Sequence, residues 1–269
     1  MERGPTAKPS AFLVPPAALY PQPSTRNPLP LSFRPVTRTR IGVLASGGGT
    51  NLQAILDFLD ELGERRCGDV AVVASDRAEA GALARARSRE IPSAVLATPR
   101  RVGGGALGPL LDEHGVELVV LAGYLRRVPD EVVTRYAGRM VNVHPALLPA
   151  FGGAGMYGMR VHDAVLASGA TVSGATVHFV DEEYDRGPII AQWPVPVLSG
   201  DDSHALAARV LRVEHVLYPR VVNAVAGGRI TLERCRAGHR IPRSADAEFI
   251  MFSPKDACLV EAIDRALDL

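Results

Sequence analysis

The chain has 269 residues, of which 47% are hydrophobic, and its formal net charge at pH 7 is +1. This length suits one large α/β domain or two small ones. A charge so close to zero gives no reason to expect nucleic acid or a membrane surface as the main partner. No apolar run approaches the roughly 20 residues that a membrane-spanning helix needs.

The cysteines give little sign of a disulfide or a metal site. Cys67, Cys235 and Cys258 are odd in number, far apart and not in a CxxC pattern. Free thiols are typical of a reducing compartment. We therefore expect a cytoplasmic protein that needs no metal.

Residues 1–37 differ from the rest of the chain because they contain nine of its 21 prolines. Such density removes backbone donors and blocks helix formation, which predicts a disordered or polyproline-like extension. With a single acidic residue and several arginines, the segment faintly resembles a transit peptide, but it lacks the apolar block of a secretory signal. We expect it to be dispensable for folding.

A glycine-rich loop follows the first apolar run of the predicted domain. Residues 41–45 read as a strand, residues 46–51 have the sequence SGGGTN, and residues 52–62 have a helical pattern. Glycines let backbone N–H groups approach an anion, and the start of a helix adds its positive dipole end. The loop is neither a Walker A motif nor a clean GxGxxG, so it indicates either a phosphate site or a tight turn.

Strands and helices alternate over the next 80 residues. The predicted strands are 69–75, 93–97 and 116–122, and the predicted helices are 78–89, one that ends near His114 and a short one after Pro129. Such alternation favours parallel strands joined by right-handed crossovers. The predicted fold class is α/β, a Rossmann-like, open, mostly parallel twisted sheet with helices on both faces.

The stretch MVNVHPALLP, residues 140–149, places an amide and an imidazole two residues apart. Residues i and i+2 of a strand point to the same face, so Asn142 and His144 should project together into one pocket. Pro145 favours an extended conformation at His144 and ends regular pairing there. Open α/β folds bind ligands at such carboxyl ends of strands. A satisfied structural histidine is the alternative for His144 alone.

The remainder is predicted to hold a helix over 160–168, strands over 171–180 and 189–197, and a long helix over 202–225. Asp185 stands beside a sharp turn made by the following Arg-Gly-Pro. A capping-like start and an apolar stripe predict an added helix within residues 253–269. We divide the chain into an extension (1–37), a catalytic domain (38–232) and a C-terminal extension (233–269).

Five segments together resemble the phosphoribosylglycinamide formyltransferase family. They are SGGGTNLQ (46–53), LAGYLR (121–126), NVHPALLP (142–149), GATVHFV (174–180) and DRGP (185–188). The resemblance covers roughly residues 40–230. It implies an enzyme that transfers the formyl group of N10-formyltetrahydrofolate to the amine of 5'-phosphoribosylglycinamide in de novo purine biosynthesis.

The resemblance assigns three catalytic residues whose types suit this chemistry. His144 would be the general acid/base, Asn142 would donate to the formyl oxygen, and Asp185 would hold water and raise the pKa of His144. His178, on the strand between them in sequence, would either belong to the core or brace the site. The family's reaction requires no metal.

The resemblance also implies two binding sites for small molecules. Gly49, Thr50 and Asn51 would hold the substrate phosphate, and Glu214 the ribose hydroxyls. The folate pocket would be formed by Leu125, Arg126, Arg127, Val128 and Asn142, faced by residues 180–185. We expect only small-molecule partners and a monomer or homodimer.

Two departures from the family pattern stand out. The loop over residues 152–162 is longer than usual, and only His162 matches one of its histidines. The folate-contacting arginine of the family has no secure counterpart, with Arg100 and Arg101 as candidates.

Alternative functions share part of this pattern. A formyltetrahydrofolate hydrolase would carry an N-terminal regulatory domain, and a methionyl-tRNA formyltransferase a larger basic C-terminal domain. Two further alternatives are a sugar-nucleotide N-formyltransferase and a catalytically inactive folate- or nucleotide-binding protein. A turnover assay separates the last from the enzymes.

Overall fold

The computed structural model describes residues 38–96, 106–234 and 240–244. The predictions for the N-terminal extension, for Arg100 and Arg101, and for a helix within 253–269 lie outside these residues. None of the helices in the described ranges is long and apolar enough to cross a bilayer.

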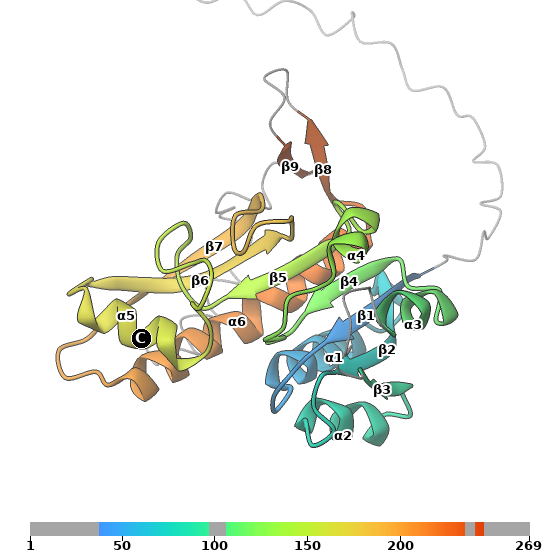
Figure 1. Ribbon diagram of the computed structural model, residues 1–269, viewed down its shortest axis with the longest axis horizontal. Helices are drawn as coiled ribbons and strands as arrows, with labels where there is room; N and C mark the ends of the chain where they lie inside the picture. The colour runs from blue at the N-terminus through green and yellow to red at the C-terminus, as the bar shows by residue number, and fades with distance from the viewer. Residues whose placement is uncertain (1–37, 97–105, 235–239, 245–269) are drawn as a thin grey trace, which may run out of the picture. The chain divides into compact units, whose positions relative to one another are not determined.

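The secondary structure alternates as the sequence predicts (Figure 1). The strands are β1 (Thr39–Leu44), β2 (Gly68–Ser75), β3 (Ser93–Val95), β4 (Leu118–Leu121), β5 (Met140–His144), β6 (Val172–Phe179), β7 (Ile189–Pro196), β8 (Ile230–Arg234) and β9 (Arg240–Ser244). The helices are α1 (Thr50–Leu62), the 3-10 turn η1 (Gly63–Arg65), α2 (Gly81–Ser88), α3 (Leu107–Glu113), α4 (Asp130–Arg135), α5 (Met159–Ala167) and α6 (Ser203–Ala226).

One seven-stranded sheet organises the domain, in the order β3-β2-β1-β4-β5-β6-β7. The strands from β3 to β5 pair in parallel, whereas β6 and β7 pair antiparallel. The predicted fold class, a mostly parallel α/β sheet, is confirmed. The strand order reverses between β1 and β4, and ligands of open α/β sheets bind beside such a reversal.

Helices cover both faces of the sheet because alternate strand residues point to opposite sides. On one face, Ile41 and Val43 of β1 share a buried cluster with side chains of α1, α2 and α6. On the other face, Leu44 shares a second buried cluster with α3 and α4. Burial on both faces explains why the central strands are continuously apolar in sequence.

The long helix α6 connects the sheet to both candidate ligand sites. Its N-cap is Asp202, whose side chain accepts a hydrogen bond of 2.7 Å from the N–H of Ala205. Its buried face includes Glu214, Tyr218 and Val221. Each predicted end of this helix lies within one residue of the observed end.

Other boundaries differ from the predicted ones. The helix predicted over 78–89 begins only at Gly81, since Ala80 closes a turn by donating to the carbonyl of Arg77. The strand predicted over 116–122 pairs only from Leu118 to Leu121. The antiparallel pair of β8 and β9 was not predicted, and β8 crosses residue 232. The proposed division of the chain stays a prediction.

Candidate active site

A cavity of about 270 Å³ opens at the carboxyl ends of β4 and β5. Its walls come from four stretches of the described chain. They lie within 121–133 after β4, 142–145 at the end of β5, 153–157 in the following loop, and 178–185 after β6. Asn142 and His144 both line this cavity, as does Asp185. The structure therefore brings the three predicted catalytic residues to one place.

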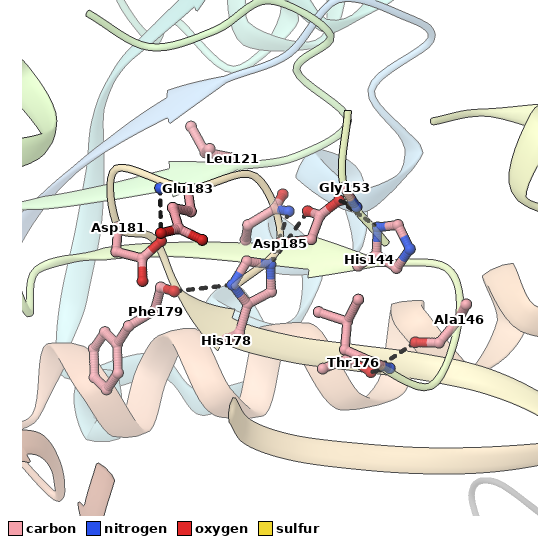
Figure 2. A network of polar contacts seen from close by, with 12 residues as sticks. Leu121, His144, Ala146, Gly153, Thr176, His178, Phe179, Asp181, Glu183 and Asp185 are labelled. Carbon is pink, nitrogen blue, oxygen red and sulfur yellow. Dashed lines mark hydrogen bonds and ion pairs between the residues drawn. The ribbon is translucent and has the colours of Figure 1, made fainter. Parts of the chain in front are cut away.

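Both ring nitrogens of His144 face an oxygen atom, and Figure 2 shows the one that belongs to Asp185. Its side chain is 3% exposed. The Nε2 atom donates to the carbonyl of Phe151 at 2.8 Å, and Nδ1 lies 3.6 Å from Oδ2 of Asp185. Two oxygen atoms facing the two nitrogens suit an imidazolium, which has a proton on each.

Burial and charge act in opposite directions on the pKa of His144. Desolvation in the protein interior lowers this pKa, and it outweighs the raising effects of the Asp185 carboxylate and of the hydrogen bond to Phe151. The sequence predicts only the raising effect of the Asp185 carboxylate on this pKa. The net pKa is therefore below the usual histidine value, although Asp185 raises it as expected.

Asp185 occupies a constrained position between two histidines. Its Oδ2 atom accepts a hydrogen bond of 2.9 Å from the N–H of Gly153, and its Oδ1 atom lies 3.7 Å from Nε2 of His178. Asp185 has a φ angle of 55°, and so does Phe151. Left-handed backbone is unfavourable for residues other than glycine and accumulates at functional sites. Both groups that face the ring of His144 thus come from strained positions.

His178 determines how Asn142 is oriented. Nδ1 of His178 donates to the carbonyl of Phe179 at 2.9 Å, and burial lowers the pKa of this histidine. The neutral ring then has a lone pair at Nε2, which accepts from Nδ2 of Asn142 at 3.2 Å. This leaves the second hydrogen of Nδ2 for a ligand oxygen. Of the two roles considered for His178, bracing the site is the one that these contacts support.

Two further residues brace the chain after His144 and were missed in the sequence. The Thr176 hydroxyl donates to the carbonyl of Ala146 at 2.6 Å and accepts from the N–H of Leu148 at 3.0 Å. Gln192 Nε2 donates to the carbonyl of Leu148 at 2.8 Å. Thr176 stands two residues before His178 on β6. Residues at this spacing in a strand point to the same face, and this pattern could have predicted Thr176 from the sequence.

The second candidate site lies at the start of α1. The N-cap residue Gly49 has no side chain to satisfy the first N–H groups of the helix. Asn51 Nδ2 donates to Oε2 of Glu214 at 2.7 Å, and both residues are buried. Burial raises the pKa of Glu214 to about 7. Thr50 begins the helix, so the four predicted substrate-binding residues are gathered around this helix end.

The glycine loop and the cavity are directly connected. The Ser46 N–H donates to the carbonyl of Gly123 at 3.1 Å, and the Ser46 hydroxyl accepts from the N–H of Leu125 at 2.9 Å. Leu125, Arg126, Arg127 and Val128 all line the cavity. The two predicted binding sites are therefore neighbours across one hydrogen-bonded junction.

The side chains of this segment make specific contacts around the cavity. Arg126 Nε lies 3.1 Å from Oδ2 of the largely buried Asp76. The guanidinium of Arg127 lies 5.8 Å from the ring of Tyr184, which belongs to the facing wall. The structure places His162 in α5, where it is buried, whereas residues 153–157 of the long loop form the cavity wall.

Comparisons with known proteins agree with this fold. A family model described as formyl transferase matches residues 39–222. The chain belongs to the formyl transferase family, whose members are enzymes.

The relatives and solved structures are more specific. The chain is 44% identical over 198 residues to phosphoribosylglycinamide formyltransferase, chloroplastic, from Arabidopsis thaliana, which covers 72% of this chain and 67% of the relative. It is 38% identical over 209 residues to phosphoribosylglycinamide formyltransferase from Escherichia coli (strain K12), covering 75% of this chain and 95% of the relative. The crystal structure of glycinamide ribonucleotide transformylase 1 from Symbiobacterium toebii superimposes with a TM-score of 0.71 at 43% identity, over 83% of this chain and 100% of that chain.

Proposed function

We propose that this enzyme transfers the formyl group of N10-formyltetrahydrofolate to the amine of 5'-phosphoribosylglycinamide, a step of de novo purine biosynthesis. The observation that carries the proposal is the junction of two sites. The cavity that contains Asn142, His144 and Asp185 is hydrogen-bonded through Ser46 to a helix start suited to a phosphate. The names of the relatives support formyl transfer to phosphoribosylglycinamide.

In the proposed reaction the substrate amine attacks the formyl carbon, and the bond from that carbon to N10 breaks. The tetrahedral intermediate carries negative charge on the former carbonyl oxygen. The free N–H of Asn142 and the protonated ring of His144 stabilise this oxyanion. One proton leaves the attacking amine and one arrives at N10, and His144 is the general acid/base for this exchange. Asp185 favours the protonated ring.

The two substrates would occupy adjoining sites. The folate would enter the cavity between residues 125–128 and 180–185, where Leu125 and Val128 provide apolar contacts. The phosphate would lie at the N–H groups of Gly49, Thr50 and Asn51, because such groups and the helix dipole favour an anion. The carboxylate of Glu214 would accept from the ribose hydroxyls.

We propose a cytoplasmic monomer or homodimer whose partners are small molecules, with residues 38–232 as the catalytic unit. The relative from Arabidopsis is named as chloroplastic, so a plastid is the alternative compartment for this enzyme.

A single assay tests the proposed function. The purified full chain is incubated with N10-formyltetrahydrofolate, and release of tetrahydrofolate is followed with 5'-phosphoribosylglycinamide or with water alone as the acceptor. Turnover that depends on the phosphoribosyl acceptor supports the proposal, and the His144→Ala variant is the matched control for background hydrolysis. Equal release without the acceptor would instead identify a hydrolase.

A further inference from the structure

The N-terminus of α2 packs directly on the backbone of the glycine loop. A Cβ atom added to Gly81 would lie 2.9 Å from the carbonyl oxygen of Gly48. A Cβ atom added to Gly49, whose φ angle is 73°, would lie 2.6 Å from the Cα atom of Ala82. Such close approach requires glycine on both sides. The shape of the loop therefore depends on α2 as well as on α1.

Two consecutive carbonyl groups of the loop are bound by α2. The N–H of Ala82 donates to the carbonyl of Gly47 at 3.2 Å. The Nε atom of Arg85 donates to the carbonyl of Gly48 at 2.8 Å, and Nη1 of the same guanidinium donates to Oε1 of Gln53 at 2.9 Å. Arg85 thus connects the loop, α1 and α2 through one planar group.

These contacts determine where the loop amides point. In a trans peptide, the C=O of one residue and the N–H of the next lie in one plane and point in opposite directions. Because the carbonyls of Gly47 and Gly48 face α2, the N–H groups of Gly48 and Gly49 face away from it. An added Cβ atom at Gly47 or Gly48 would meet nothing within 4 Å, so the loop has open space around these two residues in the Cβ direction.

We propose that Arg85 is a positioning residue for phosphate binding, one that orients the amides of Gly48 and Gly49 toward the anion without touching it. This inference rests on the proposed function, since it concerns the phosphate of the acceptor substrate. The guanidinium suits the task because its fork bonds two oxygen atoms in a fixed geometry. An amide held in place before binding loses less entropy when the anion arrives.

Arg89, the C-cap residue of α2, provides a matched control. It lies four residues after Arg85, is half-buried like it, and forms ion pairs with Asp57 and Asp60 of α1. Arg89 therefore also joins the α2 region to α1 with a positive charge, but through carboxylates and not through a carbonyl of the glycine loop. Replacing Arg89 therefore tests the loss of a positive charge and of a contact between α2 and α1, while the contacts that orient the loop peptides stay in place.

The experiment compares Arg85→Met, Arg85→Lys and Arg89→Met by steady-state kinetics. For Arg85→Met we expect KM for 5'-phosphoribosylglycinamide to rise by about tenfold, the effect of losing one charge-assisted hydrogen bond. We expect kcat and KM for N10-formyltetrahydrofolate to change by less than about twofold. Arg85→Lys should also raise the first KM, since an ammonium keeps the charge but lacks the fork. Arg89→Met should match the wild type.

Three results would overturn the inference. An unchanged KM in Arg85→Met would exclude the role, and full recovery in Arg85→Lys would reduce it to charge alone. An equal rise in Arg89→Met would show only a loosened helix. Should Arg85→Met not fold, as judged by circular dichroism, Gly81→Ala keeps the arginine and displaces the Gly48 carbonyl. It should raise the same KM, and a wild-type value there would also refute the proposal.

A binding measurement separates this inference from the proposed reaction. Full-length protein labelled with ¹⁵N-glycine is titrated with inorganic phosphate, and the amide signals of Gly48 and Gly49 are followed. Phosphate should shift both signals in the wild type and in Arg89→Met but much less in Arg85→Met. A wild type that shows these shifts without turnover would refute the proposed function alone. Shifts that persist unchanged in Arg85→Met would refute the role of Arg85 alone.

Discussion

The Oδ2 atom of Asp185 lies 3.6 Å from Nδ1 of His144, and the opposite nitrogen of the same ring donates to the carbonyl of Phe151. This pairing offsets part of the lowering of the histidine pKa by burial. Loss of the carboxylate charge should therefore lower that pKa further. A pKa change of one unit corresponds to about 1.4 kcal/mol.

The first prediction is that Asp185→Asn folds normally but loses most of its turnover at neutral pH. The ring holds a proton only below its pKa, so a lower pKa moves the alkaline limb of the kcat profile to lower pH. Steady-state kinetics across pH measures this shift, with circular dichroism as the folding control. His144→Ala should be impaired as severely, and the double variant should lose much less than the product of both losses. An unchanged pH profile in Asp185→Asn would disprove the pairing.

The second prediction concerns the oxyanion. Asn142→Ala should lower kcat by about a hundredfold, since one preorganised donor is worth roughly 3 kcal/mol in other enzymes. The effect should appear in kcat and in kcat/KM alike, because the hydrogen bond strengthens only as charge develops. The pH profile should keep its shape, which distinguishes this variant from Asp185→Asn. A variant that alters KM only would place Asn142 in substrate binding.

The third prediction concerns the helix start. Asn51→Ala should weaken binding of 5'-phosphoribosylglycinamide strongly, since it removes the side chain that joins the helix start to Glu214 and leaves Glu214 without the amide that donates to it. Affinity for the folate should stay near the wild-type value because the folate cavity is formed by other residues. Isothermal titration calorimetry with each ligand measures both affinities. Equal losses for the two ligands would contradict this placement.

The fourth prediction concerns stability against pH. The pKa of Glu214 is about 7 in the folded protein, because of burial, against 4.5 for the free side chain. The folded state therefore binds more protons between these values, and stability falls as pH rises through this window. Glu214→Gln removes the titrating group. Between pH 5 and pH 8.5, the unfolding free energy of this variant should rise relative to that of the wild type by up to about 3 kcal/mol.

Urea denaturation at several pH values measures this difference. The comparison is between the two slopes of unfolding free energy against pH, which cancels any constant effect of the substitution. Parallel curves for the wild type and Glu214→Gln would show that Glu214 does not titrate in this window.

The fifth prediction concerns Tyr218, whose buried hydroxyl lies 3.0 Å from the carbonyl oxygens of both Leu121 and Val141. Tyr218→Phe should lower the unfolding free energy by about 1–3 kcal/mol, because the buried carbonyls lose the hydroxyl that donates to them. It should also lower kcat, since Leu121 ends β4 and lines the cavity. Tyr136→Phe is the matched control.

The Tyr136 hydroxyl also makes a buried hydrogen bond to a backbone carbonyl, that of Val116, at 2.9 Å. Val116 precedes β4, at the end of that strand away from the cavity. We expect Tyr136→Phe to lose similar stability in urea denaturation without a change in kcat. Identical kinetics for the two variants would show that Tyr218 does not support the active site.

The sequence predicts the sheet and the central site because both depend on local patterns. The alternation along β5 places Asn142 and His144 on one face, and the residues 46–51 stand between a strand and a helix. The Asp202 cap and the glycines after α6 predict both of its ends. Periodicity and caps are short-range properties, so a single sequence contains them.

Other features depend on contacts between distant residues. The close packing of Gly81 on Gly48 joins residues over 30 positions apart in the sequence. The carbonyl of Phe151 that binds His144, and the role of His178 beside Asn142, follow from how loops close over the cavity. The net pKa of His144 depends on burial by the whole fold. None of these contacts leaves a local signature in the sequence.

Glu214 and Tyr218 stand four residues apart on α6, so they lie on the same side of the helix and about one turn apart. Glu214 accepts a hydrogen bond from Asn51 of the proposed acceptor site, and the Tyr218 hydroxyl lies beside the carbonyls of Leu121 and Val141 in the sheet. The proposed acceptor site and the strands that carry the cavity are thus both attached to one turn of α6. A displacement of that turn would disturb both attachments at once, so the relative placement of the two proposed substrates depends on a single rigid helical segment.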